Sequence, residues 1–231
     1  MRPIGFSTGA LAKGDVALGL ALQRELPGIE AVELSALRDR ELPALLEALP
    51  SLDVSAFAYV SVHAPSRLQT LEEESVFRLL EQLPEAWPIV VHPEILVTPS
   101  LWRRLGSRLC LENMDDRKTT GRTPDELREL FAVYPEAGFC LDVGHARQID
   151  RSMAAAREML AEFGERLRQL HVSEVSARGE HLALNAAARE AFAGIAAVIP
   201  AGCPAIIESV VAPEEMTAEL AAVRAALQGE R

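Results

Sequence analysis

Short apolar runs with strand character recur along this 231-residue chain, and stretches with helical periodicity separate them. The runs interpreted as strands cover residues 3–8, 31–35, 58–63, 88–92, 108–113, 138–143, 168–173 and 204–210. The helical stretches lie near residues 15–25, 40–48, 69–82, 99–105, 124–133, 151–166, 185–198 and 213–228. Strict alternation predicts parallel strands joined by crossover helices, and eight such units predict a compact (β/α)8 TIM barrel. We therefore expect one α/β domain spanning residues 1–231.

An open, doubly wound sheet is the alternative architecture. It is disfavoured because no glycine-rich phosphate loop follows the first strand, and because polar residues follow many strands rather than one switch point. Local signals at the helix starts agree with the alternation. Thr123-Pro124-Asp125-Glu126 matches a capping box, Thr98-Pro99 repeats its first two residues, and Asp150 precedes a helical stretch as a candidate cap.

The composition is that of a globular chain, with 49% hydrophobic and 25% charged residues. No apolar stretch approaches the roughly 18 residues that a membrane span requires, so no membrane partner is expected. The amino-terminal residues lead directly into a strand and lack the apolar core of a signal peptide. The three cysteines form no CxxC pair, and their odd number argues against a disulfide framework. A reducing cytoplasm is the expected location.

The net charge of −11 bears on the partner. Proteins that track a nucleic-acid backbone carry basic patches, and the lysines of this chain are only Lys13 and Lys118. Nucleic acid is therefore the disfavoured partner, and a small-molecule substrate is the favoured one. Assembly into a homo-oligomer is compatible with the sequence, which does not decide it.

The histidines all end or closely follow a short apolar run: His63, His92, His145, His171 and His181. Acidic residues occupy matching places: Glu112, Asp142 and Glu208. Buried acids are costly unless they are paired or bound to metal, and imidazole with carboxylate is a ligand set for zinc, manganese or iron. Active sites of (β/α)8 barrels lie at the carboxyl ends of the strands. The pattern therefore predicts a metal centre at that end.

Strand parity supports this prediction. Side chains alternate between the faces of a strand, so residues two apart point the same way. The residue two positions before each candidate ligand is expected to fill the barrel interior, while the ligand reaches its mouth. The pairs are Ser61 with His63, Val90 with His92, Cys110 with Glu112, Cys140 with Asp142, Gln169 with His171 and Ile206 with Glu208.

The strongest candidate ligands come from strands five to eight: Glu112, Asp142, His171 and Glu208. The alternative is a group of polar residues that satisfy one another, but three of the four are anionic and would repel without a cation. His63 and His92 either complete a second metal position, with Glu112 between the ions, or contact substrate. His145 either binds metal or polarises a substrate oxygen. His181 is a further candidate, with a solvated loop histidine as its alternative.

Other polar residues near the strand ends carry weaker signals. Glu33 ends the second strand and is expected to face the cavity, where it either orients a ligand histidine by a hydrogen bond or forms a simple ion pair. Arg117, Lys118 and Arg122 lie in the loop after the fifth strand. They either meet an anionic group of the substrate or stay solvated.

At these residues the chain resembles the xylose isomerase-like TIM barrel superfamily, which holds sugar phosphate isomerases and epimerases together with the endonuclease IV group. The resemblance covers nearly the whole chain, and its most specific segments are LCLENMD, FCLDVGHA, LHVSE and IIES. In the epimerases four such ligands bind one divalent metal, usually manganese. The resemblance implies that Glu112 and Glu208 also exchange protons with the substrate carbon.

The endonuclease IV group adds histidines after strands three, four and six and an Asp-x-His pair after strand seven. The resemblance implies up to three zinc ions, and the chain matches the added histidines at His63, His92, His145 and His181. It departs from the group at Gly179, where the acid of the last pair is usual, and at Glu174, where a shorter acid is usual. Glu180 is the candidate replacement for the missing acid.

These observations leave three functions open. The favoured one is a divalent-metal-dependent isomerase or epimerase acting on a small sugar or hydroxy-carbonyl compound, with Glu112 and Glu208 as acid and base and His145 assisting. The first alternative is a zinc-dependent phosphoesterase of endonuclease IV type, in which two or three ions activate water. The second is a metal-binding barrel without turnover. In each case we expect zinc or manganese, in one to three ions.

Overall fold

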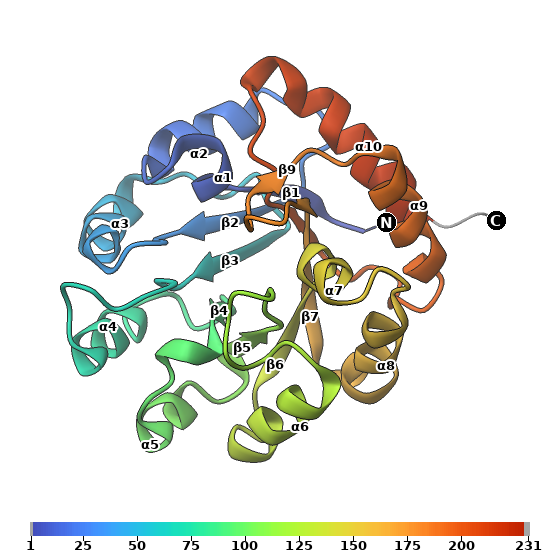
Figure 1. Ribbon diagram of the computed structural model, residues 1–231. Coiled ribbons are helices and arrows are strands. Elements are labelled where there is room, and N and C mark those ends of the chain that lie inside the picture. Colours follow the sequence, from blue (N-terminus) through green and yellow to red (C-terminus); the bar gives the residue numbers. More distant parts are fainter. Residues whose placement is uncertain (1, 229–231) are drawn as a thin grey trace.

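Eight parallel strands close into a barrel in the computed structural model, which describes residues 2–228 (Figure 1). The order around the barrel is β1-β10-β7-β6-β5-β4-β3-β2, so the first and last barrel strands are neighbours. The strands are β1 (Ile4–Ser7), β2 (Ala31–Ser35), β3 (Tyr59–His63), β4 (Ile89–Val91), β5 (Leu109–Glu112), β6 (Gly138–Asp142), β7 (Leu167–Val172) and β10 (Ala205–Ile207). The predicted (β/α)8 fold is confirmed; residues 1 and 229–231 of the predicted domain lie outside the described part.

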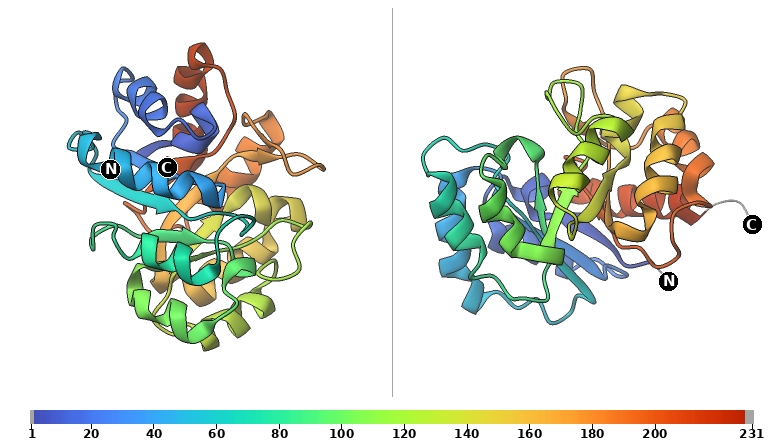
Figure 2. Two further views of the ribbon diagram at one scale, coloured as in Figure 1. Left: turned by 90° about the vertical axis from the view of Figure 1, so that its left-hand side faces the viewer. Right: turned by 90° about the horizontal axis from the view of Figure 1, so that it is seen from below.

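Helices surround these strands on the outside (Figures 1 and 2). They are α1 (Thr8–Ala12), α2 (Val16–Arg24), α3 (Leu42–Ala48), α4 (Glu73–Leu80), α5 (Pro99–Trp102), α6 (Pro124–Val133), α7 (Val143–Ile149), α8 (Ala154–Phe163), α9 (Ala186–Ala196) and α10 (Met216–Gln228). Each predicted helical stretch contains a helix, whereas the short helices α1 and α7 were not predicted. Among residues 2–228, no helix has the length and apolar character needed to cross a membrane.

A short antiparallel hairpin, also not predicted, lies between β7 and α9. It pairs β8 (Glu174–Val175) with β9 (His181–Leu182). The hairpin and the loop after β5 project from the same end of the barrel (Figure 2). The backbone carbonyl of His181 accepts a hydrogen bond from the N–H of Val210 at 3.1 Å, which ties the hairpin to the segment after β10. His181 is therefore held in place rather than left in an open loop.

Apolar side chains fill the space between strands and helices. Phe131 of α6, Phe139 of β6 and Phe163 of α8 pack ring against ring, with centroids 4.8–6.1 Å apart. Burial of such rings contributes roughly 1.5–3 kcal/mol each to stability. The outer core leaves the inner faces of the same strands free for a different layer.

Inside the barrel, Val90, Cys110 and Cys140 form a cluster separate from the outer core. Their inward direction follows from strand alternation, because Leu109, Leu111 and the equivalent residues of β4 and β6 join the outer core. Each of the three lies two residues before a candidate ligand. The candidate ligands two residues further along each strand therefore lie above this inner layer, at the barrel mouth.

Gly5 is required where the first two strands approach each other. A Cβ atom at this position would stand 1.6 Å from the carbonyl oxygen of Ala31 in β2. Only a residue without a side chain fits this contact, which closes the barrel beside its first strand.

The predicted helix caps are formed in part. The hydroxyl of Thr123 accepts a hydrogen bond from the N–H of Glu126 at 3.2 Å, but the Glu126 carboxylate bonds one residue further back, so only half of the capping box exists. Thr98 donates its hydroxyl hydrogen to Glu73 at 2.6 Å and makes no cap of its own. Asp150 is not the N-cap of α8, which is Met153, but its carboxylate accepts the N–H of Ala155 in the first turn at 3.0 Å.

Candidate metal centre

Polar side chains from β2 onwards converge at the carboxyl end of the barrel, next to a cavity of about 240 Å³. Six of them line the cavity, whereas Glu33, Asp142 and His171 lie behind its wall. Each of these strands, or the segment directly after it, contributes at least one predicted residue: Glu33, His63, His92, Glu112, Asp142, His145, His171, His181 and Glu208. All but His92, His181 and Glu208 are buried, and those three are half-buried. The structure brings the predicted histidines and acids together at one mouth.

Glu112 lies at the centre of this group and is 1% exposed. Its Oε2 atom faces Nε2 of His63 at 3.2 Å and Nε2 of His92 at 3.3 Å. Its Oε1 atom faces Nδ1 of His171 at 3.3 Å. The two imidazoles on Oε2 lie edge to face, with ring centroids 5.0 Å apart. One carboxylate is therefore divided between two groups of nitrogen donors.

Two groups of candidate ligands share this carboxylate. The first consists of His63, His92 and Glu112, and the second of Glu112, Asp142, His171 and Glu208. Within each group, one donor atom of every member lies within 4.8 Å of the others. Such spacing is compact enough for a single cation to contact all members of one group.

Unpartnered atoms test whether these groups fit a cation. Asp142 Oδ2, His92 Nδ1, His145 Nε2 and His171 Nδ1 are buried and have no hydrogen-bond partner among residues 2–228. Buried polar atoms nearly always have a partner, because leaving one unpaired costs about 1–3 kcal/mol. Nδ1 of His171 and Oδ2 of Asp142 belong to the same group of four. The residues present therefore fit a divalent metal that completes their coordination.

Backbone carbonyls orient two of the histidines. Nδ1 of His63 donates to the carbonyl oxygen of Ala64 at 2.6 Å, so Nε2, which donates to Glu112 at 3.2 Å, is the nitrogen that a cation would take over. Nδ1 of His145 donates to the carbonyl oxygen of Asn113 at 3.0 Å, which leaves its Nε2 free. Ligand histidines typically donate their second N–H in this way, because the bond fixes both tautomer and ring direction.

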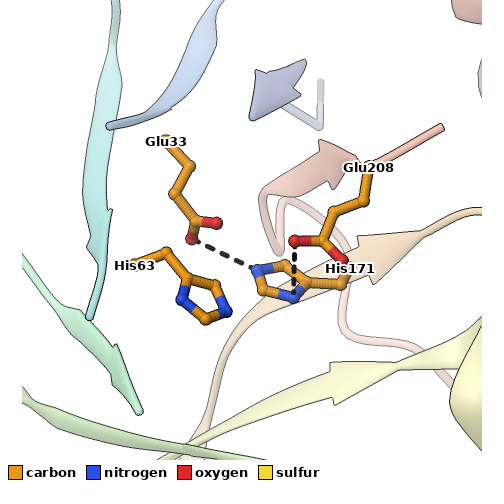
Figure 3. A group of neighbouring side chains, drawn as sticks. All are labelled: Glu33, His63, His171 and Glu208. Carbon is orange, nitrogen blue, oxygen red and sulfur yellow. Dashed lines mark hydrogen bonds and ion pairs between the residues drawn. The ribbon is translucent and has the colours of Figure 1, made fainter. Parts of the chain in front are cut away.

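The carboxylate of Glu33 orients the imidazole of His171. Figure 3 shows Glu33 and Glu208 approaching the two nitrogens of this ring from different sides. Nε2 of His171 donates to Oε2 of Glu33 at 3.2 Å, while Nδ1 lies 3.5 Å from Oε1 of Glu208. Gln169 donates to the same oxygen of Glu33 at 2.7 Å. The orienting contact considered for Glu33 in the sequence is present in the structure.

A third group is less complete. Asp142, His145 and His181 bring donor atoms within 4.8 Å of one another, but Asp142 already belongs to the group of four. Nδ1 of His181 lies 2.9 Å from the hydroxyl of Ser173. Gly179, two residues before His181, offers no side chain. The third group therefore has no carboxylate of its own.

The carboxylates divide the histidines into two electrostatic classes. Burial alone would lower the pKa of His63, but its hydrogen bond to Glu112 and the charge of Glu33 raise that pKa to about 9. For His145, burial is likewise outweighed by the charge of Asp142 and contact with Glu112, and its pKa rises to about 10. These histidines hold protons in the metal-free protein, where a cation would replace them.

The pKa values of His92 and His181 are lowered, and that of Glu208 is raised. Burial lowers the pKa of His92 to about 4 and that of His181 to about 3. Burial also raises the pKa of Glu208 to about 7, partly opposed by the nearby His171. The positive charge of His171 offsets burial at Glu112 and holds its pKa well below the usual range. Among the carboxylates of the two ligand groups, Glu112, which both groups share, is the one whose pKa is lowered.

Three predicted residues belong neither to the cavity wall nor to the groups of donors. Glu174 pairs with Arg147 at 2.6 Å, because it points outward from β8. Glu180 bonds to Ser176 within its own hairpin and does not replace the missing acid. Arg122 is paired with a carboxylate of α6 at 2.6 Å and does not line the cavity. Each has an ion or hydrogen-bond partner that accounts for it.

The loop after β5 brings other charges to the cavity wall. Arg117 and Lys118, for which the sequence left an anion contact and a solvated position open, line the cavity, and so does Arg67 of the loop after β3, which the sequence did not single out. Asp115 was also missed. It is 1% exposed, lines the cavity and lies 3.9 Å from Nε2 of His145. Its run of charged neighbours resembled a solvated loop, so the sequence held no signal for its burial.

Comparisons with known structures bear on the whole chain. A crystal structure of endonuclease IV from Thermus thermophilus is similar, with 22% identity, a TM-score of 0.67, and 98% of this chain and 99% of that chain covered. A crystal structure of an IolI protein with a bound zinc atom has 13% identity, a TM-score of 0.61, and 98% of each chain covered. SacUVDE has 15% identity and a TM-score of 0.57, with 97% and 98% covered.

No protein-family model matches the chain, and no curated protein matches it. The similarity in structure extends over almost all of each chain, although the sequences are at most 22% identical. The resemblance that the motifs suggested is confirmed at the level of architecture. The chain therefore shares the (β/α)8 barrel fold of these three structures.

Proposed function

We propose that this chain is a zinc-dependent phosphoesterase that acts on a small phosphorylated compound. The division of Glu112 carries the proposal: Oε2 faces His63 and His92 at 3.2 and 3.3 Å, and Oε1 faces His171 at 3.3 Å. A carboxylate shared in this way can bridge two cations. Two-metal sites are typical of enzymes that displace an oxygen at phosphorus.

In this proposal each of the two ligand groups would hold one ion. His63, His92 and Glu112 would hold one ion, and Glu112, Asp142, His171 and Glu208 would hold the other. When bound, the ions supply an activated water and neutralise charge on the phosphate. The two imidazoles of the first group favour zinc, because manganese prefers oxygen ligands.

Residues of the protein would orient the ligand histidines, and one carboxylate would transfer a proton. The carbonyls beside His63 and His145 fix both tautomers, as Glu33 does for His171. Glu208 is 12% exposed at its side chain, and burial raises its pKa to about 7. Its Oε2 atom faces His181 at 3.4 Å, apart from the contact of Oε1 with His171, and is the atom at which a proton would be taken up or released.

Cavity size and charge indicate the substrate class. A volume of about 240 Å³ lies below the roughly 300–1,000 Å³ of pockets for drug-sized ligands. Arg67, Arg117 and Lys118 line the cavity, so its rim is locally cationic although the net charge is −11. We therefore propose a small phosphate ester and not nucleic acid. The buried free cysteines suit the reducing cytoplasm that we propose as the location.

The similarity to an endonuclease IV structure supports a metal-dependent hydrolase, since this chain covers 99% of that one. An isomerase or epimerase is the second candidate, and one observation favours it. Glu112 Oε1 and Glu208 Oε1 both face Nδ1 of His171, at 3.3 and 3.5 Å. Two carboxylates so placed could exchange protons with opposite sides of one substrate carbon.

Metal content and two activity assays test the proposal. Protein purified without chelators should contain about two zinc ions per chain by elemental analysis. It should hydrolyse p-nitrophenyl phosphate or bis(p-nitrophenyl) phosphate, and chelation should abolish the activity. A single manganese ion per chain, with solvent deuterium entering a ketose substrate and no phosphate ester cleaved, would establish the isomerase instead. Stoichiometric metal with neither reaction would leave a binding protein without turnover.

A further inference from the structure

A glycine and an arginine from different loops occupy one position beside the cavity. Gly179 lies in the turn of the β8–β9 hairpin with a φ of +72°. A Cβ atom there would stand 1.8 Å from Cζ of Arg117 and 2.2 Å from its Nε and Nη2. The guanidinium therefore fills the space that any other residue at position 179 would need.

Several contacts hold this guanidinium in place. Nε and Nη2 of Arg117 donate to the carboxylate of Asp115 at 3.0 and 2.6 Å, and Nη1 donates to the carbonyl oxygen of Arg178 at 3.0 Å. Asp115 is itself buried and also accepts the backbone N–H of Arg117 at 2.8 Å. One hydrogen on each Nη atom has no partner within residues 2–228. The cation is fixed, yet two donors remain available.

The fixed guanidinium lies beside the candidate ligands of the cavity. Arg117 lines the cavity together with His145, His181 and Glu208. It is linked to His145 through Asp115, whose Oδ2 lies 3.9 Å from Nε2 of that histidine. Its side chain is 46% exposed, so a ligand can reach it. This is the side of the cavity where the third ligand group has no carboxylate of its own.

The other cations of the wall are placed differently. Lys118 is only 8% exposed, and its ammonium group is already paired with Glu94 at 2.7 Å. Arg67 is exposed, and no hydrogen bond fixes its guanidinium within the described chain. Arg117 alone among these three combines a fixed position with free donors. A planar guanidinium with two free N–H groups matches the oxygens of a phosphate group.

We propose that Arg117 binds an anionic oxygen of the substrate, and that Gly179 makes this possible by leaving room for the guanidinium. The inference rests on the proposed phosphoesterase function and deepens it. In this chain a protein cation stands beside His145 and His181, so two ions and one arginine supply the positive charge. The ligand chemistry is a phosphate group at the end of the cavity nearest the hairpin.

Binding of inorganic phosphate to the zinc-loaded protein tests the proposal directly. Titration calorimetry should show that Arg117→Met raises the Kd for phosphate about 10- to 100-fold, the usual loss for hydrogen bonds to a charged group. Arg117→Lys should lose less, because it keeps the charge but not the fork. Gly179→Ala should weaken phosphate as Arg117→Met does, because its Cβ displaces the guanidinium. Arg122→Met, which removes a paired cation outside the cavity, is the matched control and should bind phosphate normally.

Zinc content separates this proposal from the function on which it rests. It should stay the same in all four variants, because Arg117 is not a ligand. An unchanged phosphate Kd in Arg117→Met, with wild-type protein that binds phosphate, would overturn the role of Arg117 and leave the phosphoesterase intact. Wild-type protein that holds zinc but neither binds phosphate nor cleaves its esters would overturn both. A lower zinc content in Arg117→Met would show that Arg117 supports the metal instead.

Discussion

Glu112 and His171 meet through one carboxylate oxygen: Oε1 of Glu112 lies 3.3 Å from Nδ1 of His171. The same oxygen lies 3.4 Å from Nδ1 of His145, and the other oxygen faces His63 and His92, at 3.2 and 3.3 Å. Each half of one buried carboxylate therefore belongs to a different group of donors. The two-ion site that we propose rests on this division.

Removing the imidazoles on Oε2 should remove one ion only. The double variant His63→Ala with His92→Ala should lose about one zinc equivalent per chain by elemental analysis, because the group of four does not need them. Phosphatase activity should fall by at least about 100-fold, as expected when one ion of a two-metal site is lost. Circular dichroism should show a retained fold. If both zinc equivalents remained, the two histidines would be substrate contacts.

Glu208→Gln keeps the shape of the side chain and removes its charge. We expect weaker zinc binding in the group of four and a fall in kcat of about 100-fold or more, because Glu208 also transfers a proton. Glu180→Gln is the matched control, since Glu180 bonds only within its hairpin. Zinc titrations and steady-state kinetics measure both effects. Wild-type affinity and rate in Glu208→Gln would remove this residue from the centre.

Glu33 should act on metal through His171. It is fully buried and bonds to Nε2 of that histidine at 3.2 Å, and Gln169, held in turn by Tyr59 at 2.8 Å, bonds to the same oxygen. Glu33→Gln should weaken zinc binding about 10- to 100-fold, the usual cost of losing such an orienting contact. The pH dependence of zinc uptake should shift as well, because His171 loses a negative neighbour. Equal zinc affinity at every pH would show that Glu33 serves the fold only.

Asp39 stabilises the loop after β3 and makes stability depend on pH. Its carboxylate accepts the N–H groups of Gln69, Thr70 and Leu71 at 2.5–2.9 Å, and these bonds hold its pKa well below the ordinary value despite burial. Because the folded pKa is depressed, this stability is present above the unfolded pKa of about 3.9 and is lost as pH falls towards the folded pKa. Asp39→Ala should cost about 3 kcal/mol in chemical denaturation at pH 7.

The matching pH series checks the sign of the Asp39 effect. The difference in unfolding free energy between wild type and Asp39→Ala should be constant from pH 8 to about pH 5 and shrink below about pH 4. Asp53→Ala is a suitable comparison, because Asp53 is exposed and bonds mainly to its own loop. A difference that grew with falling pH would contradict the assignment.

Duplex DNA should bind weakly. The net charge is −11, and phosphate contacts along a backbone require clustered lysine or arginine. At physiological salt we expect a Kd no tighter than about 10⁻⁴ M, at the weak end of non-specific binding. Fluorescence anisotropy with a labelled duplex measures it. Micromolar binding that falls steeply with salt would favour a nucleic-acid substrate.

The sequence predicted the barrel well because its two periodicities are independent of tertiary detail. Alternation of strands and helices set the architecture, and the spacing of Cys110 with Glu112 and of Cys140 with Asp142 set which side chains turn inward. These rules act within a few residues of the chain. They predict which candidate ligands lie at the barrel mouth, but not which of these side chains contact one another.

The unpredicted features depend on contacts between distant segments. Asp115 is buried because Arg117 reaches across to Gly179, more than 60 positions along the chain, and no local pattern encodes that meeting. The hairpin that holds His181 has only two residues in each strand, too few to alternate visibly. The helix α7 begins directly after Asp142, whose carboxylate accepts the N–H of His145, and this cap lies within a strand signal.

The position of β1 between β2 and β10 has a consequence for assembly. Glu33 of β2 and Glu208, directly after β10, lie on the two strands that flank this first strand, while the other donors follow around the ring. The orienting contact between Glu33 of β2 and His171 of β7 joins strands that β1 and β10 separate, so it can form only once the ring has closed. Zinc affinity should then depend on the closed ring. Because zinc binds only the folded protein, free zinc at 100 times its Kd should raise the free energy of unfolding by about 2.7 kcal/mol.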